Sequence, residues 1–151
     1  MKLVIQRVQS ASVTVDGKEV ACIGPGAVVL AGVAQGDTPM DVSFLARKTS
    51  QLRIFDDEQG KLNAAIDAAR GSFLVVSQFT LYGDCGKGNR PSYIEAAAPE
   101  EAQKLYESYV GELRRLGHDV KTGVFGGKML VQIANDGPVT ILMESRGRTA
   151  R

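Results

Sequence analysis

The chain has 151 residues, of which 44% are hydrophobic and 23% are charged. A length near the common domain size predicts a single domain, and the apolar content excludes an intrinsically disordered chain. Two cysteines are too few for a disulfide scaffold, and with one histidine they form no metal-binding motif. We therefore expect a folded domain in the cytoplasm, without a metal, another cofactor or a membrane span.

Basic residues are concentrated at the C-terminal end. Of the 18 basic side chains, three lie in residues 146–151, where there is no acidic residue: Arg146, Arg148 and Arg151. The rest of the chain carries 15 basic and 17 acidic side chains, a net charge of −2. Charge alone therefore gives no sign of a nucleic-acid binder. We predict one domain over residues 1–145, followed by a basic tail over residues 146–151.

The N-terminal part of the chain has the pattern of β-strands. Strands are expected at Lys2–Val8, Ser12–Val15 and Glu19–Ile23, and Asp16-Gly17 has the composition of a tight hairpin turn. The uninterrupted apolar run Ala27–Val33 is typical of a fully buried strand.

Two helices are expected further along the chain. The first begins at Asp37-Thr38-Pro39, with a capping side chain and a proline at the first helical position, and ends near Leu52. The second, Pro99–Leu116, has one apolar stripe at the helical period and ends at Gly117. Because these helices do not alternate strictly with strands, the predicted fold class is α+β: a mixed, mostly antiparallel sheet curled into a barrel-like core, with two main helices. The other expected strands are Arg53–Phe55, Ser72–Gln78, Asp119–Phe125, Lys128–Ala134 and Val139–Met143.

Two segments contain groups suited to a binding site. Ser77–Thr80 places polar side chains at the end of an apolar strand, where they would leave the core and enter a cleft. Asn135–Thr140 has the composition of a tight turn between two strands. Its Gly137-Pro138 bond can be cis at a cost of about 0.5–1 kcal/mol, and a cis pair can point neighbouring carbonyls in one direction. Composition alone leaves a purely structural role open for both segments.

Other reactive side chains give weaker signals. His118 follows the long helix, where the helix dipole favours a solvated imidazole; a nucleophilic pair with Cys85 is the alternative. The acidic run Asp56-Asp57-Glu58 is typical of a turn rather than of a metal site. The usual motifs of P-loop, dinucleotide-binding, zinc-peptidase and serine-hydrolase proteins do not occur in the sequence.

Several motifs occur together in one order from Met1 to about Ser145. Ser77–Thr80 and Asn135–Thr140 are the two signatures, and further matching stretches are Arg7-Val8, Ala11–Val13, Leu52–Phe55, Lys87–Ser92 and Gly123–Met129. In this order and spacing, the sequence resembles the D-aminoacyl-tRNA deacylases, formerly called D-tyrosyl-tRNA deacylases. Gly127 and Ala64-Ala65 depart from the family pattern, but neither lies in the two signatures.

The resemblance implies a homodimer that hydrolyses the ester bond of D-aminoacyl-tRNA, with active sites at the subunit interface. It implies that Gly137-Pro138 is cis and reaches from one subunit into the pocket of the other, and that Arg7 holds this loop in place. The residues expected to line the pocket for the aminoacylated terminal adenosine are Ser77, Gln78, Phe79 and Thr80, with Phe125 and Met129 on the adenine side.

Chiral selection would then be steric. If two parallel carbonyls hold the substrate ammonium, a D side chain points to open space, whereas an L side chain points into backbone. Glycine has no side chain to reject, so glycyl-tRNA would also be hydrolysed. Because the enzyme would hold chiefly one terminal nucleotide, the net charge of −2 does not conflict with an RNA substrate.

The catalytic route has two alternatives. In the favoured one, the 2′-hydroxyl of the terminal ribose activates water, and backbone N–H groups near Phe79 and Thr80 stabilise the oxyanion. In the other, Thr80 is a nucleophile, although its motif contains no base. Two other functions remain as alternatives: a non-catalytic tRNA-binding module that uses the same pocket, and a thiol or metal hydrolase. Lys87 and Arg90 are candidate phosphate contacts, although each alone also fits an ordinary surface side chain.

Overall fold

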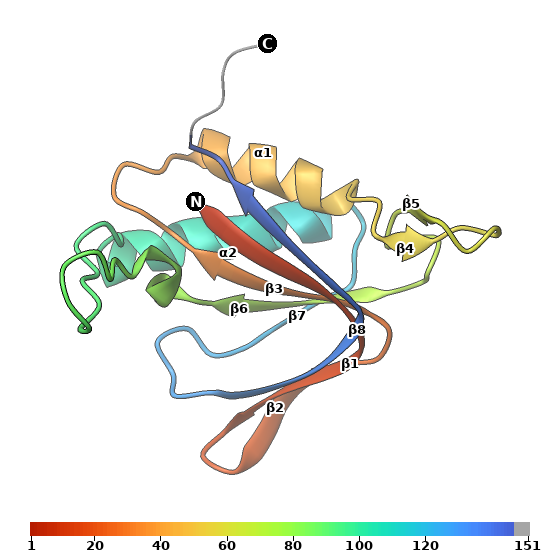
Figure 1. The fold of residues 1–151 in the computed structure, drawn as a ribbon, viewed down its shortest axis with the longest axis horizontal. Coiled ribbons are helices and arrows are strands. Elements are labelled where there is room, and N and C mark those ends of the chain that lie inside the picture. The colour runs from red at the N-terminus through yellow and green to blue at the C-terminus, as the bar shows by residue number, and fades with distance from the viewer. Residues whose placement is uncertain (147–151) are drawn as a thin grey trace.

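β1 (Lys2–Val15) is the central strand, and the other strands are arranged around it (Figure 1). The computed structural model describes residues 1–146; the predicted tail from residue 147 onward lies outside them. Within the described residues, one sheet has the order β2-β1-β3-β6-β7, and β8 also pairs with β1. The other elements are β2 (Lys18–Ile23), β3 (Gly26–Gly32), α1 (Pro39–Ser50), β4 (Phe55–Asp56), β5 (Leu62–Ala64), β6 (Ser72–Ser77), the 3-10 helix η1 (Phe79–Tyr82), α2 (Pro99–Arg115), β7 (Val120–Thr122) and β8 (Leu130–Glu144).

The two halves of β1 pair with different strands. Lys2–Val8 pairs with β3 and Ala11–Val15 pairs with β2, while β8 runs along β1 for nearly its whole length. These pairings are antiparallel, whereas β3–β6 and β6–β7 are parallel. Because β2 also contacts β7, the sheet curls into a nearly closed barrel. The structure confirms the α+β class, the mixed sheet and its barrel-like curvature.

Alternation along the strands divides the interior into two apolar cores. In β6, Phe73 and Val75 belong to the larger core that the sheet forms with the helices, whereas Leu74 and Val76 belong to a smaller core inside the barrel. The smaller core is completed by residues from the first three strands, among them Val13 and Val28. A strand buried on both faces explains why this stretch of sequence is continuously apolar.

The two helices lie side by side over one face of the sheet (Figure 1). At the start of α1, the Thr38 N–H donates to the Asp41 carboxylate at 2.8 Å, as expected for a capped N-terminus. The predicted apolar stripe of α2 is buried up to Leu113, whereas Leu116 lies just past the helix and is exposed. The Tyr109 hydroxyl donates to Thr49 of α1 at 2.8 Å. Gly117 has a φ of +95° just after α2, so the left-handed cap predicted there is confirmed.

Several predicted strand boundaries were wrong, among them that of Arg53–Phe55, where the strand β4 covers only Phe55–Asp56. Lys2–Val8 and Ser12–Val15 are one strand, because β8 still pairs with β1 where β1 changes partner from β3 to β2. Likewise, Ala134 and the four residues before it belong, together with Val139–Met143, to the single strand β8, which begins at Leu130 rather than at Lys128. β7 ends at Thr122 rather than at Phe125, because the chain leaves the sheet there as a loop over residues 123–129.

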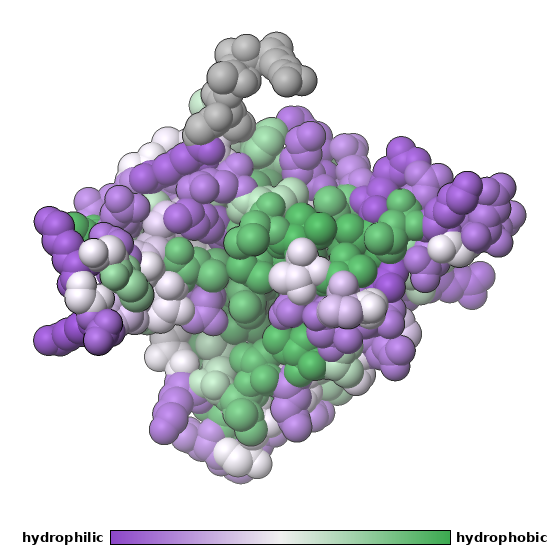
Figure 2. All heavy atoms as spheres, in the orientation of Figure 1, coloured by the Kyte–Doolittle hydropathy of each residue, from purple (hydrophilic) through white to green (hydrophobic). Residues whose placement is uncertain are grey.

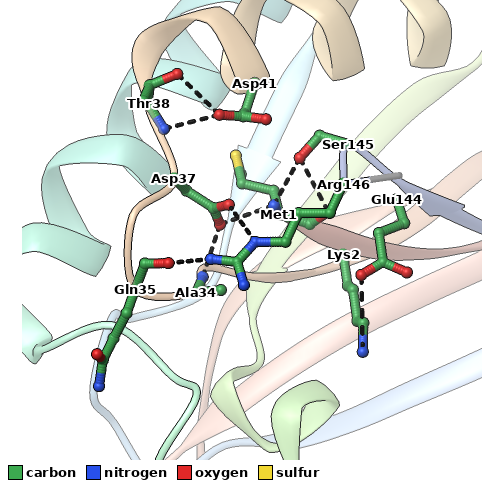
Figure 3. Close-up of polar contacts among 10 residues, drawn as sticks. All are labelled: Met1, Lys2, Ala34, Gln35, Asp37, Thr38, Asp41, Glu144, Ser145 and Arg146. Carbon is green, nitrogen blue, oxygen red and sulfur yellow. Dashed lines mark hydrogen bonds and ion pairs between the residues drawn. The ribbon is translucent and has the colours of Figure 1, made fainter. Parts of the chain in front are cut away.

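Both ends of the described chain meet beside the start of α1 (Figure 3). The Met1 α-nitrogen donates to Ser145 Oγ at 2.7 Å and lies 2.7 Å from Asp37 Oδ2. Arg146 was assigned to the tail from sequence, but its Nε lies 3.4 Å from Asp37 Oδ1 and its Nη2 donates to the Gln35 carbonyl. Among the described helices, none has the length and apolarity needed to cross a bilayer.

Candidate active site

A cavity of about 560 Å³ opens where the end of β6, the start of α2 and the 123–129 loop meet. Its walls are largely apolar, and its volume lies in the range of small-molecule sites. The predicted site residues in its walls are Ser77, Gln78, Phe79, Phe125 and Met129. The structure thus brings together five residues that two separate stretches of sequence provide.

The polar side of the cavity is built by the turn that follows β6. The Gln78 N–H donates to the Ala31 carbonyl at 2.8 Å, which extends the pairing of β6 with β3 up to the cavity edge. The chain then enters η1, where the Phe79 side chain is 57% exposed and packs edge-on against the Tyr93 ring at 5.1 Å. Because the N–H groups at the start of a short helix have no acceptor within the helix, this turn presents donors near the cavity.

Thr80 lies at the edge of this site rather than in its walls. Its side chain is exposed, and its hydroxyl accepts a hydrogen bond from the Gln78 amide. The described hydrogen-bond partner of the Thr80 hydroxyl is thus the Gln78 amide, and an amide cannot act as a general base. Thr80 was expected to line the cavity, but it is not among the residues of the cavity walls, and its described link to them is the contact with Gln78.

The opposite wall is formed by the 123–129 loop and α2. The Phe125 ring packs against the Tyr106 ring at 5.6 Å between centroids, and both line the cavity. The Tyr106 hydroxyl donates to the Val75 carbonyl at 2.8 Å, and burial raises the pKa of Tyr106 to about 12. Gly123 donates its N–H to the same carbonyl at 3.2 Å, so one acceptor of β6 ties both α2 and the loop in place.

Gly137 and Pro138 lie on an irregular stretch of β8. β8 has three more residues than β1 between the pairs Val8–Asn135 and Gln6–Thr140. The Gly137-Pro138 peptide bond in this stretch is cis, as the family resemblance implied. The Asn135 amide closes the bulge by donating to the Arg7 carbonyl at 2.9 Å and to the Val139 carbonyl at 3.1 Å.

Arg7 contacts this bulge from the neighbouring strand. Its side chain is only 10% exposed; its Nε lies 3.0 Å from Asp136 Oδ2, and its Nη1 donates to the Ile54 carbonyl at 3.0 Å. Asp56 completes the pairing at 3.3 Å from Nη1. Gly137 and Pro138 themselves are exposed and contribute nothing to the walls of the cavity in their own chain.

The environment predicted for His118 was wrong. His118 is buried, with Nε2 2.6 Å from Ser50 Oγ and Nδ1 3.1 Å from Asp67 Oδ1, and its ring packs on Phe73. It therefore links the C-terminal ends of the two helices instead of being solvated. Cys85 is exposed, and both ring nitrogens of His118 already have other partners, so the alternative pairing is not formed.

Acidic residues expected to form a turn have two roles. Asp57 Oδ1 accepts the N–H groups of Gln59 and Lys61, which confirms the turn. Asp56 instead pairs with Arg7, a contact that the turn composition gave no means of predicting. Across residues 1–146, no group of three or more His, Cys, Asp or Glu side chains is arranged to hold a metal ion.

Sequence reasoning did not identify Tyr93 and Tyr106 as residues of the cavity. The sequence placed Tyr106 in the apolar stripe of α2, and the residue is indeed buried. It was not identified because this stripe packs against the core and also lines the cavity. Tyr93 lies in a loop without periodicity. Its nearness to the Lys87–Ser92 motif is the one sequence signal that could have indicated a place at the site.

The chain matches a family of hydrolases that act on aminoacyl-tRNA: the family model described as D-Tyr-tRNA(Tyr) deacylase covers residues 4–144. Among curated relatives, a D-aminoacyl-tRNA deacylase of Desulforamulus reducens is 58% identical over 146 residues, covering 97% of this chain and 98% of the relative. A second, from Heliobacterium modesticaldum, is 55% identical over 147 residues with the same coverage. The chain belongs to this family and is a D-aminoacyl-tRNA deacylase.

Two solved structures share the fold. One, titled as a c-Myc DNA unwinding element binding protein, has a TM-score of 0.90 and 42% identity, covering 95% of this chain and 98% of that one. The other is titled as a probable eukaryotic D-amino acid tRNA deacylase and has a TM-score of 0.79 at 15% identity, covering 94% of this chain and 97% of that one. At that identity the second likeness concerns the fold alone.

Proposed function

We propose that the cavity binds the aminoacylated terminal adenosine of tRNA and that the protein hydrolyses its D-aminoacyl ester for chiral proofreading. The observation that supports this best is the convergence of Ser77, Gln78 and Phe79 with Phe125 and Met129 around one cavity of about 560 Å³. The apolar wall suits a planar base, and the polar turn suits an ester and ribose hydroxyls. We place the reaction in the cytoplasm, because both cysteines are free thiols.

The active unit in this proposal is a homodimer in which Gly137 and Pro138 of one subunit enter the cavity of the other. Both residues are exposed and lie outside the cavity of their own chain, although Arg7 and Asp136 hold their backbone. Figure 2 shows apolar residues gathered over β1 and β8, and β8 is the strand that contains this segment. Leu130 and Leu142 of β8 are 63% and 80% exposed, as expected for residues that a second subunit covers.

Selection against L-amino acids is steric in this proposal. The backbone carbonyls near Gly137 and Pro138 bind the substrate ammonium, which leaves space at the α-carbon for a D side chain but not for an L side chain. No side chain of the protein reads the identity of the amino acid. Many D-aminoacyl-tRNAs are therefore accepted, and so is glycyl-tRNA.

Water activated by the 2′-hydroxyl of the terminal ribose is the proposed nucleophile. Thr80 is a weak nucleophile without an adjacent base, and its hydroxyl is bonded to the Gln78 amide, while His118 is held by Ser50 and Asp67. Backbone N–H groups near Phe79 and Thr80 stabilise the developing oxyanion, which is usually a large contribution to ester hydrolysis.

The direct test uses purified protein with D-tyrosyl-, L-tyrosyl- and glycyl-tRNA, with and without a chelator. We expect rapid release from the D-tyrosyl and glycyl substrates, slow release from the L-tyrosyl substrate and no effect of the chelator. Equal rates on D and L substrates would exclude the steric selection. Loss of activity with chelator would indicate a metal hydrolase. Light scattering should give twice the mass of one chain.

The alternative is a non-catalytic nucleic-acid-binding module that uses the same cavity. One observation favours this alternative: the solved structure with 42% identity to this chain is titled as a DNA unwinding element binding protein. The charge balance of residues 1–145, with 15 basic and 17 acidic side chains, supports the enzyme instead, because a protein that follows a nucleic-acid backbone needs a basic surface. Tight binding of uncharged tRNA without release of D-tyrosine would favour the module.

A further inference from the structure

Two loops at the cavity mouth carry exposed basic side chains that have no acidic partner. Lys87 and Arg90 lie on the loop between η1 and α2, and Lys128 lies on the loop between β7 and β8. Arg7 and Arg115 form ion pairs with acidic side chains, whereas within the described residues these three basic side chains form none. Their charges are therefore available to a ligand.

The first of these loops is held firmly at its base. Asp84 and Ser92 exchange two backbone hydrogen bonds of 2.8 Å, and Asp84 Oδ1 accepts the Gly86 N–H at 2.8 Å. The next residue, Tyr93, packs on Phe79 in the cavity wall. The closed base places Lys87 and Arg90 at the tip of a short projection anchored to the site.

The second loop faces the same cavity. Its residues Gly126, Gly127 and Met129 line the cavity, and Lys128 lies between them in sequence with its side chain exposed. Figure 1 shows the two loops projecting at the same end of the molecule. The cavity mouth thus has unpaired positive charge on two loops, although residues 1–145 as a whole carry a net charge of −2.

We propose that Lys87, Arg90 and Lys128 bind the phosphodiesters immediately preceding the terminal adenosine of the aminoacyl-tRNA. This inference rests on the proposed placement of that adenosine in the cavity. Each nucleotide before it brings one phosphate just outside the cavity mouth, where lysine and arginine side chains supply the complementary charge. Such a local site explains how a protein without a basic surface holds the single-stranded end of an RNA.

The test compares two substrates, D-tyrosyl-tRNA and D-tyrosyl-adenosine, of which the second has no phosphate. The variant K87Q/R90Q/K128Q should lower kcat/KM on D-tyrosyl-tRNA at least about tenfold at ~50 mM salt. The slope of log kcat/KM against log salt should become flatter by about two units, as expected for the loss of three contacts to a single strand. Hydrolysis of D-tyrosyl-adenosine should stay at the wild-type rate.

The matched control is K18Q/R47Q/K61Q, which removes the same charge from exposed residues of elements that do not line the cavity. It should keep the wild-type slope. The inference is overturned if the control variant flattens the salt slope as much as the loop variant does, or if the loop variant has the wild-type slope. It is also overturned if the loop variant loses as much activity on D-tyrosyl-adenosine as on D-tyrosyl-tRNA. A wild-type protein that hydrolyses neither D-tyrosyl-tRNA nor D-tyrosyl-adenosine would instead refute the proposed function on which this inference rests.

Discussion

Asp37 Oδ2 lies 2.7 Å from the α-nitrogen of Met1, and both side chains are almost fully buried, at 1% and 0% exposed (Figure 3). The same oxygen accepts the Ala34 N–H at 2.7 Å. Ser145 Oγ also accepts a hydrogen bond from the α-nitrogen, so the ammonium and the carboxylate together join the start of β1, the segment before α1 and the end of β8.

Replacing Asp37 by Asn should destabilise the fold strongly. Asn keeps the shape but leaves the buried α-ammonium of Met1 without a counter-charge, and breaking a buried pair typically costs about 3–5 kcal/mol. Urea unfolding followed by circular dichroism measures this loss. Glu58→Gln, which changes an exposed turn residue, is the control and should stay within about 0.5 kcal/mol of wild type. A loss below 1 kcal/mol for Asp37→Asn would contradict the importance of the pair.

Acid should weaken the fold partly through Asp41. Partial burial acts to raise the pKa of Asp41, but hydrogen bonds from Ser145 and Thr38 outweigh it and lower the pKa to about 2. A pKa lower in the folded than in the unfolded state stabilises the fold above about pH 4, and this contribution is lost as the pH falls towards 2. Asp41→Asn should therefore be less stable than wild type by about 1 kcal/mol at pH 6, after allowance for solvent screening, and the difference should shrink by pH 2. Urea unfolding at each pH measures it; a constant difference would disprove this linkage.

Replacing Arg7 by Lys should impair activity although the charge is kept. A lysine cannot contact Asp56, Asp136 and the Ile54 carbonyl at once, so the Gly137-Pro138 segment loses part of its support. We expect kcat/KM on D-tyrosyl-tRNA to fall roughly 10–100-fold and the preference for D over L to weaken. Arg53→Lys, at an exposed arginine that binds Asn63, serves as control. Unchanged kinetics in Arg7→Lys would show that Arg7 does not position this segment.

Substitution of Thr80 should discriminate between the two catalytic routes. With 2′-hydroxyl assistance, Thr80→Ala retains activity within about threefold, and a 2′-deoxy terminal adenosine lowers kcat at least about 100-fold. Single-turnover kinetics on the two substrates measures both effects. Thr80→Ser tests whether any residual loss reflects the missing acceptor for the Gln78 amide. The reverse pattern would identify Thr80 as a nucleophile.

Tyr106→Phe should affect substrate binding more than the chemical step. The variant keeps the ring beside Phe125 but loses the hydrogen bond to the Val75 carbonyl, which also holds Gly123. We expect a several-fold increase in KM, little change in kcat, and a stability loss of about 1 kcal/mol. Tyr82→Phe is the matched control, because the buried Tyr82 hydroxyl makes no hydrogen bond in the described structure. An equal effect of both variants on KM would refute the role of Tyr106.

The fold class could be predicted because the spacing of apolar residues along the sequence indicates which side chains of a helix or strand are buried. The apolar stripe of α2 and the continuous run of β3 each indicated the correct element. The strand breaks were wrong for a physical reason: Asn135–Thr140 has the composition of a turn, yet the flanking residues of β8 stay paired with β1. Local turn chemistry cannot show whether a chain reverses direction or bulges and continues.

Residues of the cavity could be predicted where they belong to a sequence motif. They could not be predicted where tertiary packing alone brings them to the cavity. Ser77, Gln78 and Phe79 belong to one short segment, whereas Tyr106 reaches the cavity only because α2 crosses the sheet there. His118 shows the same limit. The helix dipole favours a solvated imidazole, but Ser50, Asp67 and Phe73 bury it, and none of these is near it in sequence.

The pairing of β1 with β8 has a consequence for folding during synthesis. β1 leaves the ribosome before the other described elements, and its partner over Leu130–Glu144 is the last described strand to emerge. Until then, one hydrogen-bonding edge of the central strand stays unpaired, which is the condition that favours aggregation or pairing with another chain. A nascent chain of this protein therefore depends on prompt synthesis of its last strand, or on a chaperone that shields β1 in the meantime.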